Sequence, residues 1–180
     1  MLVRHSLPDL LTHYVVSYLI ASRLFRSRYA LVLALVGLLP DVDALLRIHR
    51  WVTHSLVLTA LVATAIVLPA ICLSLKYLNY LITAVALYSL HLVMDILTAP
   101  TPILWPLVNK EYMLSLGIDG IVSCEGVSVK PYAELVVTDV DFTPKPTIDG
   151  PIASTTGIII SIAIIALTLI EWLRRKHAHI

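Results

Sequence analysis

The residues best suited to chemistry in this chain lie between positions 37 and 55, in the sequence GLLPDVDALLRIHRWVTHS. Asp41 and Asp43 follow a proline that ends one apolar run, and His54 opens the next. Ionisable groups at a membrane edge are costly unless they pair or bind something. Because carboxylates and imidazoles together suit zinc, manganese or iron, this stretch predicts a metal site.

Three further side chains have the same character. His91 and Asp95 are four residues apart in an apolar run, so they share one face of a helix, and His13 lies in the first apolar run. Alternating helix directions place all of these groups toward the same membrane face. The predicted ligands are His13, Asp41, Asp43, His54, His91 and Asp95. They are enough for one or two divalent ions, with zinc expected and manganese or iron as alternatives.

A two-ion site can activate water and stabilise both the attacking and the leaving oxygens of a phosphoester. We assign catalytic roles to Asp43 and His54. Arg50 is the candidate to bind a substrate phosphate. His49 could do the same, although an interfacial anchor explains it as well. Asp-x-Asp at a helix end can direct both carboxylates to one place if the chain unwinds after Pro40.

Each group also has a simpler explanation. His13 could form a hydrogen bond between helices, and the two aspartates could sit at a solvated helix end. Arg47 and Arg50 could be interfacial anchors. The pair His91 and Asp95 is harder to explain in this way, since a buried carboxylate in a membrane needs a partner.

Composition places the chain in a membrane. Of 180 residues, 58% are hydrophobic and 14% are charged, against about a quarter charged in soluble domains. A net charge of +1 gives no indication of nucleic-acid binding, and two distant cysteines make neither a zinc finger nor a disulfide framework. No cleavable signal is evident, so the first helix is expected to remain in the mature protein.

The predicted fold is an all-α polytopic membrane protein with about five transmembrane helices and a small β-rich extramembrane insertion. The apolar runs cover residues 10–22, 29–46, 51–75, 77–97 and 157–173. The first is short for a full span. We divide the chain into a four-helix membrane region with the metal site (1–100), the insertion (101–156) and a last helix with a basic tail (157–180). Residues 121–129 and 134–142 are the expected β-type runs.

The basic residues orient this arrangement. Five spans place seven basic residues, in the link after the first helix, at Lys76 and in the C-terminal tail, on one side. The positive-inside rule then predicts a multi-pass cell-membrane protein whose insertion and site lie on the extracytoplasmic side. The expected partners are the lipid bilayer and a lipid or phosphoester substrate, while the sequence does not reveal an oligomeric state.

The order and spacing of five motifs across residues 10 to 107 resemble the YdjM-like family of membrane-bound, metal-dependent hydrolases. The motifs are Thr12-His13, Leu39-Pro40-Asp41-Val42-Asp43, the segment from His49 to Ser55, the segment from His91 to Thr98, and Leu104-Trp105-Pro106. The resemblance implies an integral membrane hydrolase with a divalent metal on the six predicted ligands. The family's distant similarity to zinc-dependent phospholipase C implies a phosphoester or lipid-like substrate.

Two positions depart from the family pattern. Trp51 stands where the family usually has glycine, and the usual glycine before the Leu-Trp-Pro element is absent. Both departures predict altered access to the site.

Two other functions compete with the hydrolase. An ion or metal transporter would also place acids and histidines in the membrane, but it needs polar residues through the whole thickness, and residues 56–68 and 78–86 are nearly featureless. A metal-stabilised, non-enzymatic membrane protein would keep the metal and hydrolyse nothing.

Overall fold

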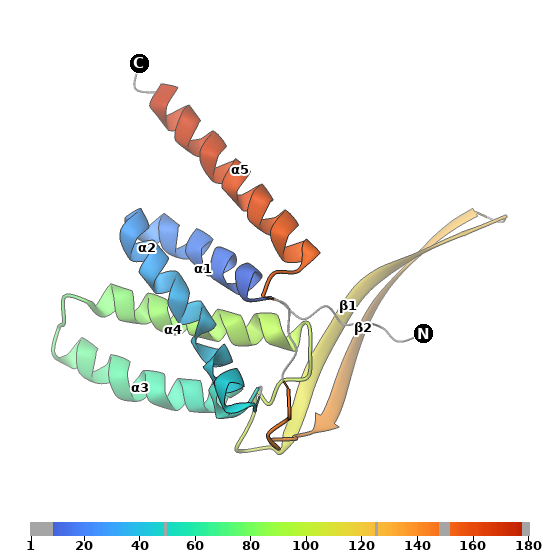
Figure 1. The fold of residues 1–180 in the computed structure, drawn as a ribbon, viewed down its shortest axis with the longest axis horizontal. Coiled ribbons are helices and arrows are strands. Elements are labelled where there is room, and N and C mark those ends of the chain that lie inside the picture. The colour runs from blue at the N-terminus through green and yellow to red at the C-terminus, as the bar shows by residue number, and fades with distance from the viewer. Residues whose placement is uncertain (1–8, 49, 125, 148–151, 178–180) are drawn as a thin grey trace.

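A computed structural model describes residues 9–48, 50–124, 126–147 and 152–177. Within them the chain forms a body of helices, a two-stranded antiparallel sheet and a C-terminal helix (Figure 1). The α-helices are α1 Leu10–Leu24, α2 Ser27–Ala34, α3 Leu56–Cys72, α4 Leu78–Ile96 and α5 Thr155–His177. Two 3-10 helices, η1 Leu35–Leu46 and η2 Val52–His54, connect α2 to α3.

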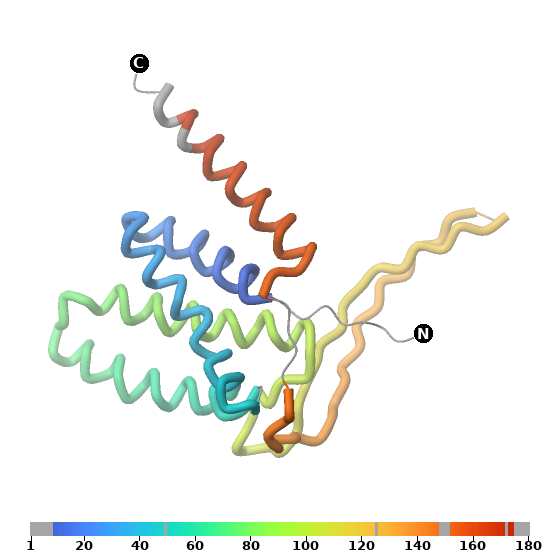
Figure 2. Tube along the Cα trace, viewed as in Figure 1, coloured from blue at the N-terminus to red at the C-terminus, as the bar shows by residue number. Residues whose placement is uncertain are grey.

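Helices α3 and α4 run antiparallel beside each other, and α2 with η1 crosses α4 (Figures 1 and 2). Small residues of α1 and α2 let these helices approach α4 closely, around a core formed by Ala21, Ala30, Leu33 and Leu87. The sheet and the start of α5 lie toward the same end of the body, where α4 finishes. This end also holds the predicted ligands.

The prediction of about five membrane-spanning helices is wrong. Among the described residues two helices are long and apolar enough to span: Ser27–Leu46, which is α2 continued by η1, and Leu78–Ile96. A span needs about 20 residues, whereas α1 has 15 and α3 has 17. The apolar run 51–75 becomes shorter as a helix because η2 occupies its start and the chain turns after Cys72.

The run from Ser27 to Leu46 changes from an α-helix to a 3-10 helix at Leu35, five residues before Pro40. Proline lacks an N–H and disturbs the preceding α-helical turn. A 3-10 stretch of 12 residues is unusual, since runs longer than about four residues are uncommon and often mark a functional segment. This segment carries both aspartates of the predicted site.

The sheet is a hairpin of β1 Lys110–Ser123 and β2 Gly126–Asp139 that projects away from the helical body (Figure 1). The insertion is therefore β-structured as expected, but the predicted run 121–129 contains the hairpin's turn rather than one strand. Gly126 has a φ of 134°, a conformation that glycine adopts readily. Gly126 is thus the residue at which the second strand begins, directly after the turn.

Beyond its base, from Leu114 to Val122 and from Val127 to Leu135, one face of the hairpin carries only apolar residues. The register pairs Leu114 with Leu135, Ile118 with Pro131 and Val122 with Val127, and directly opposed residues point to the same side of a sheet. The opposite face packs against the body near its base, where Met113 is 4% exposed. Alternation along the strands thus separates an apolar outer face from the face that contacts the helices.

Asp9 joins the starts of α1 and α5. Its carboxylate accepts a hydrogen bond from the backbone N–H of Thr12, at 2.6 Å, and another from the backbone N–H of Ser154. A Cβ on Gly157 would collide with this carboxylate. Burial raises the pKa of Asp9, but the hydrogen bonds from Ser154 and Thr12 outweigh it and lower the pKa. A charged Asp9 therefore caps the N-terminus of α1 and binds Ser154, whose hydroxyl in turn accepts from Gly157 N–H in the first turn of α5.

Candidate metal centre

Four of the predicted ligands converge at the end of α4. One ligand atom from each of Asp41, His54, His91 and Asp95 lies within 4.8 Å of the other three. The side chain of His54 is fully buried, and that of Asp41 is the most exposed of the four at 16%. The group comes from η1, η2 and α4. Two carboxylates and two imidazoles at this separation could hold a divalent cation.

Both histidine rings are held in orientation through their Nδ1 atoms. The Nδ1 of His54 lies 3.0 Å from Asp43 Oδ2, and the Nδ1 of His91 lies 2.7 Å from the carbonyl oxygen of Gly37. An imidazole whose Nδ1–H donates to an oxygen keeps a lone pair on Nε2 and cannot rotate freely. The two Nε2 atoms face the cluster, where that of His91 has no hydrogen-bond partner within the described structure. This is the arrangement expected of metal-ligating histidines.

The two aspartates of η1 act on opposite sides of the same ring. Asp41 Oδ1 is 3.7 Å from His54 Nε2, while Asp43 Oδ2 is on the Nδ1 side. A 3-10 helix turns about 120° per residue, so residues two apart point in different directions. The condition under which both carboxylates could reach one place, unwinding after Pro40, is not met, because the chain continues as a 3-10 helix to Leu46.

Asp43 is held in place by the segment before His54. Its Oδ2 accepts hydrogen bonds from the backbone N–H of Trp51 and from the hydroxyl of Thr53, both at 2.7 Å. The Asp43 side chain is 1% exposed. Asp43 therefore supports the ligand His54 and is not one of the four converging groups.

His13 also lies beside the cluster and outside the four. Its Nε2 is 3.3 Å from Asp95 Oδ1, the carboxylate oxygen opposite the one in the cluster. The His13 ring stacks on that of His91, with 3.8 Å between centroids. His13 thus fixes the position of one ligand by a polar contact and of another by packing.

Arg50, the predicted phosphate-binding residue, makes a buried ion pair with the cluster. Its Nε lies 3.0 Å from Asp95 Oδ2. The same oxygen lies 3.2 Å from His54 Nε2, so its neighbours are a guanidinium and the imidazole of a ligand. Arg50 has a φ of 59°, an uncommon backbone conformation for a residue with a side chain. The turn between η1 and η2 thus directs a cation into the site. His49 lies outside the described residues.

The carboxylates create a strongly negative environment. Burial lowers the pKa of His54, but its contacts with Asp41, Asp43 and Asp95 outweigh burial and raise the pKa to about 10. Groups that favour a proton on an imidazole so strongly also favour a divalent cation at the same position. The site is therefore electrostatically suited to a cation held by the two carboxylates and two imidazoles. The nearby guanidinium suits an anion beside that cation.

Some residues of the site were not among the sequence predictions. Thr53, Tyr88 and the Gly37 carbonyl support the ligands: the Tyr88 hydroxyl donates to the Thr53 carbonyl at 2.6 Å. Glu111, at the start of β1, is within electrostatic reach of Arg50, and burial raises its pKa. Hydroxyls and carbonyls of this kind give no signal in a single sequence, since their role depends on which helices meet.

Gly37 provides a test of this support. A Cβ at this position would collide with the Ser17 hydroxyl, so Gly37→Ala should push η1 away from α1 and displace the carbonyl that holds His91. We expect a loss of about 1–3 kcal/mol in unfolding free energy and about tenfold weaker metal binding. Thermal denaturation and metal titration measure the two effects.

The matched control is Gly120→Ala in the hairpin, where a Cβ would meet nothing within 4 Å. Equal metal affinity in the two variants would contradict the role of the Gly37 carbonyl.

The comparisons with known proteins agree with a membrane location. No curated protein and no solved structure matches the chain. The family model described as YdjM inner membrane protein matches residues 9–178, which is nearly the whole chain. The match includes all four converging ligands and the two helices that, among the residues the structure describes, are long and apolar enough to span a membrane. The chain belongs to the YdjM inner membrane protein family.

Proposed function

We propose that this protein is a metal-dependent hydrolase of phosphoesters that acts at the membrane surface, with zinc as the expected ion. The observation that carries the proposal is the pair of imidazoles whose Nδ1 atoms are engaged by Asp43 and Gly37, so that both Nε2 atoms face two carboxylates. Such preorganisation suits a bound cation.

A bound divalent cation supplies an activated water and polarises a phosphoryl oxygen. The chain's own residues then have distinct roles. Asp41, His54, His91 and Asp95 are the ligands, and Asp43 and His13 are positioning residues behind them. Arg50, beside Asp95, is placed to pair with a phosphate. In the reaction the water oxygen bonds to phosphorus, the bond to the leaving alcohol breaks, and the leaving oxygen takes a proton.

A metal-stabilised structural protein is the second candidate. Four protein ligands around one position is the pattern of closed structural zinc sites, whereas catalytic sites keep one position open. The Arg50 contact bears on this choice, since Asp95 Oδ2 already has a guanidinium neighbour at 3.0 Å. A ligand oxygen shared in this way is easier to displace, which favours an open coordination position.

Hydrolysis separates the two candidates. Protein purified in detergent and stripped with a chelator is assayed with ethyl p-nitrophenyl phosphate before and after addition of zinc, manganese or iron. The enzyme proposal expects p-nitrophenol release that returns with metal and is lost in Arg50→Ala. Metal uptake at one ion per chain without release of p-nitrophenol, from this substrate or from longer-chain esters, would support the structural role.

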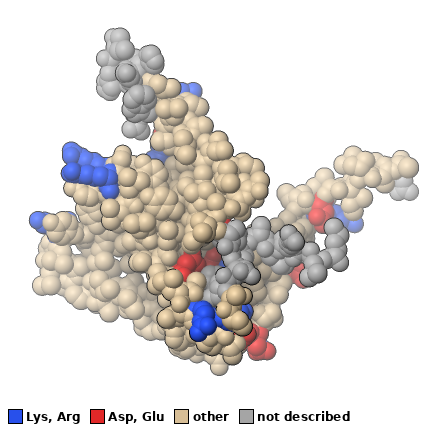
Figure 3. Space-filling model, in the orientation of Figure 1, with Lys and Arg blue, Asp and Glu red and all other residues tan. Residues whose placement is uncertain are grey.

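We also propose that the site faces away from the cytoplasm. Arg26, Arg28 and Lys76 are exposed at the opposite end of the body, where Figure 3 shows basic side chains over the α1–α2 connection. The only acid near them among the described residues, Glu171, pairs with Arg23 at 2.6 Å. Exposed basic residues in short connections favour the cytoplasmic side.

The chain contains its own reporters for this orientation. Cys72 at the end of α3 and Cys124 near the hairpin tip are both exposed, and α4 separates them. In intact cells an impermeant maleimide should label Cys72→Ser, which retains Cys124, and leave Cys124→Ser unlabelled. The reverse pattern would place the site on the cytoplasmic side.

A further inference from the structure

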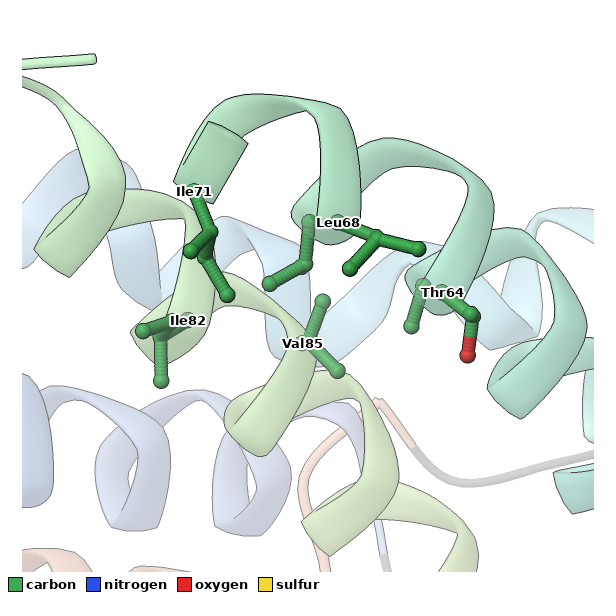
Figure 4. Close-up of a pocket in the computed structure, with 7 residues that line it drawn as sticks. Thr64, Leu68, Ile71, Ile82 and Val85 are labelled. Atoms are coloured by element: carbon green, nitrogen blue, oxygen red, sulfur yellow. The ribbon is translucent and has the colours of Figure 1, made fainter. Parts of the chain in front are cut away.

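An apolar groove of about 380 Å³ opens between η1, η2, α3 and α4, and its lining includes Thr53, Thr59 and Tyr88. We name it the α3–α4 groove. A second pocket of about 370 Å³, which reaches Ile71 and Ile82 (Figure 4), shares only Ala63 and Val85 with it. The two linings use different faces of α3, so the second pocket is separate from the groove.

The groove meets the site at Thr53. The Thr53 hydroxyl donates to Asp43 at 2.7 Å and is 3.2 Å from the Nδ1 of the ligand His54. The Tyr88 hydroxyl, at the same end, donates to the Thr53 carbonyl. One end of the groove is thus built from residues that position a ligand.

The chemistry of the walls selects the occupant. The hydroxyl groups of the groove already donate hydrogen bonds within the chain: that of Thr59 donates to the Ser55 carbonyl at 2.7 Å, and those of Thr53 and Tyr88 donate as described above. The other side chains that line the groove are aliphatic or alanine. A polar ligand would bury hydrogen-bonding groups without partners here, which costs free energy, whereas a hydrocarbon chain has no such groups and incurs no such cost.

Length and location point to the same occupant. From Leu58 to Ile66, the α3 wall of the groove rises about 12 Å, which is most of the roughly 15 Å of one bilayer leaflet's hydrocarbon. Wall residues Val62 and Ile66 are at least half exposed. In an inner membrane protein such an open apolar surface on a helix pair meets lipid chains directly.

We propose that the α3–α4 groove binds one long hydrocarbon chain of a membrane lipid whose phosphate headgroup lies at the Asp41–His54–His91–Asp95 cluster. The placement of the headgroup rests on the proposed function, whereas the placement of the hydrocarbon chain rests on the groove alone. It makes the substrate class a long-chain lipid phosphoester, with the groove as its specificity-determining region. The headgroup approaches the cluster past Asp41, which is the most exposed of the four ligands.

The test blocks the groove at its α3 wall. Ala63→Trp fills this wall, and Leu61→Trp, on the same helix with 62% exposure and outside the lining, is the matched control. Two phosphodiesters with the same leaving group are compared, hexadecyl p-nitrophenyl phosphate and ethyl p-nitrophenyl phosphate. We expect Ala63→Trp to lower kcat/KM for the hexadecyl ester about tenfold, as for loss of contact with a few methylene groups, with the ethyl ester within about twofold.

A binding readout keeps the groove testable if no hydrolysis occurs. Hexadecyl phosphate with a diazirine near the chain end is photolysed with the protein in nanodiscs, and the labelled peptides are mapped. Labels on α3 around Leu58 to Ile66 and on α4 around Ala84 to Tyr88 that fall several-fold in Ala63→Trp and persist in Leu61→Trp support the groove. Labels spread over all helices, unchanged by Ala63→Trp, would overturn it, as would labels at a contact between two copies of the chain.

The two proposals can fail separately. Groove-specific labelling without hydrolysis of either ester would remove the enzyme and keep the lipid site. Hydrolysis of both esters with the same chain-length preference in Ala63→Trp and wild type would keep the enzyme and remove the groove as its specificity region.

Discussion

Replacing His91 with alanine is expected to weaken zinc binding by at least about a hundredfold, because even groups that only support a ligand contribute about ten- to a hundredfold. The variant loses an Nε2 that lies 3.5 Å from Asp41 and 3.7 Å from Asp95. It also removes the hydrogen bond to the Gly37 carbonyl, so the effect combines a lost ligand with a loosened η1. Elemental analysis of purified protein and competition with a fluorescent chelator measure it.

The control is Asn79→Ala, an exposed position on the same helix α4 at its opposite end. Its metal content should equal that of wild type. If His91→Ala retained one ion per chain at unchanged affinity, the four-residue centre would be excluded as the binding site.

Metal affinity is expected to rise about tenfold per pH unit between pH 7 and pH 9, because one proton must leave His54 for each ion bound. The metal-free chain holds this proton up to a pKa of about 10, since contacts with Asp41, Asp43 and Asp95 outweigh burial. Calorimetric titration in buffers of different ionisation enthalpy should detect the release of about one proton per ion at pH 7.

The sign for stability is opposite. A pKa raised above the ordinary value of about 6.5 means that the protonated histidine stabilises the metal-free fold fully below that pH. This contribution is lost as the pH rises through about 10. Asp43→Asn should reduce both the proton release and the alkaline loss of stability. Zinc binding with no proton release in any buffer would show that His54 is not a ligand.

The local chemistry of the site could be read from the sequence. The four-residue spacing of His91 and Asp95 on a helix predicted one shared face, and both side chains reach the cluster from α4. Alternating helix direction predicted that Asp41 and His54 would meet them at one end. Helical periodicity and chain reversal are short-range properties, so residue order alone was enough for this part.

The roles within the site needed the tertiary structure. Residue types could not distinguish ligands from their supports, and the six predicted ligands divide into four converging groups with Asp43 and His13 beside them. The division depends on the 3-10 geometry of η1, which turns Asp41 and Asp43 to opposite sides of His54. The choice between α-helical and 3-10 turns reflects packing against α1 and α4, which a single sequence does not specify.

The number of spanning helices was the largest error. Hydropathy detected the apolar runs correctly, but it did not show that capping at Ser55 and the turn after Cys72 shorten α3 to 17 residues. The strands of the hairpin were also misplaced by the sequence prediction, because the run 121–129 was expected to be one strand. The register shows that it contains the turn, which lies just before Gly126.

What the sequence by itself determined is therefore the inventory: apolar segments, a set of acids and imidazoles, and the end of the bundle where they meet. Only the tertiary structure decided which Nε2 and carboxylate oxygens converge, which groups hold them, and that an apolar groove lies beside the supporting residues Thr53 and Tyr88. The inventory follows from composition and local periodicity. Convergence of the ligand atoms within 4.8 Å depends instead on how closely the helices pack, which small residues such as Gly37 permit.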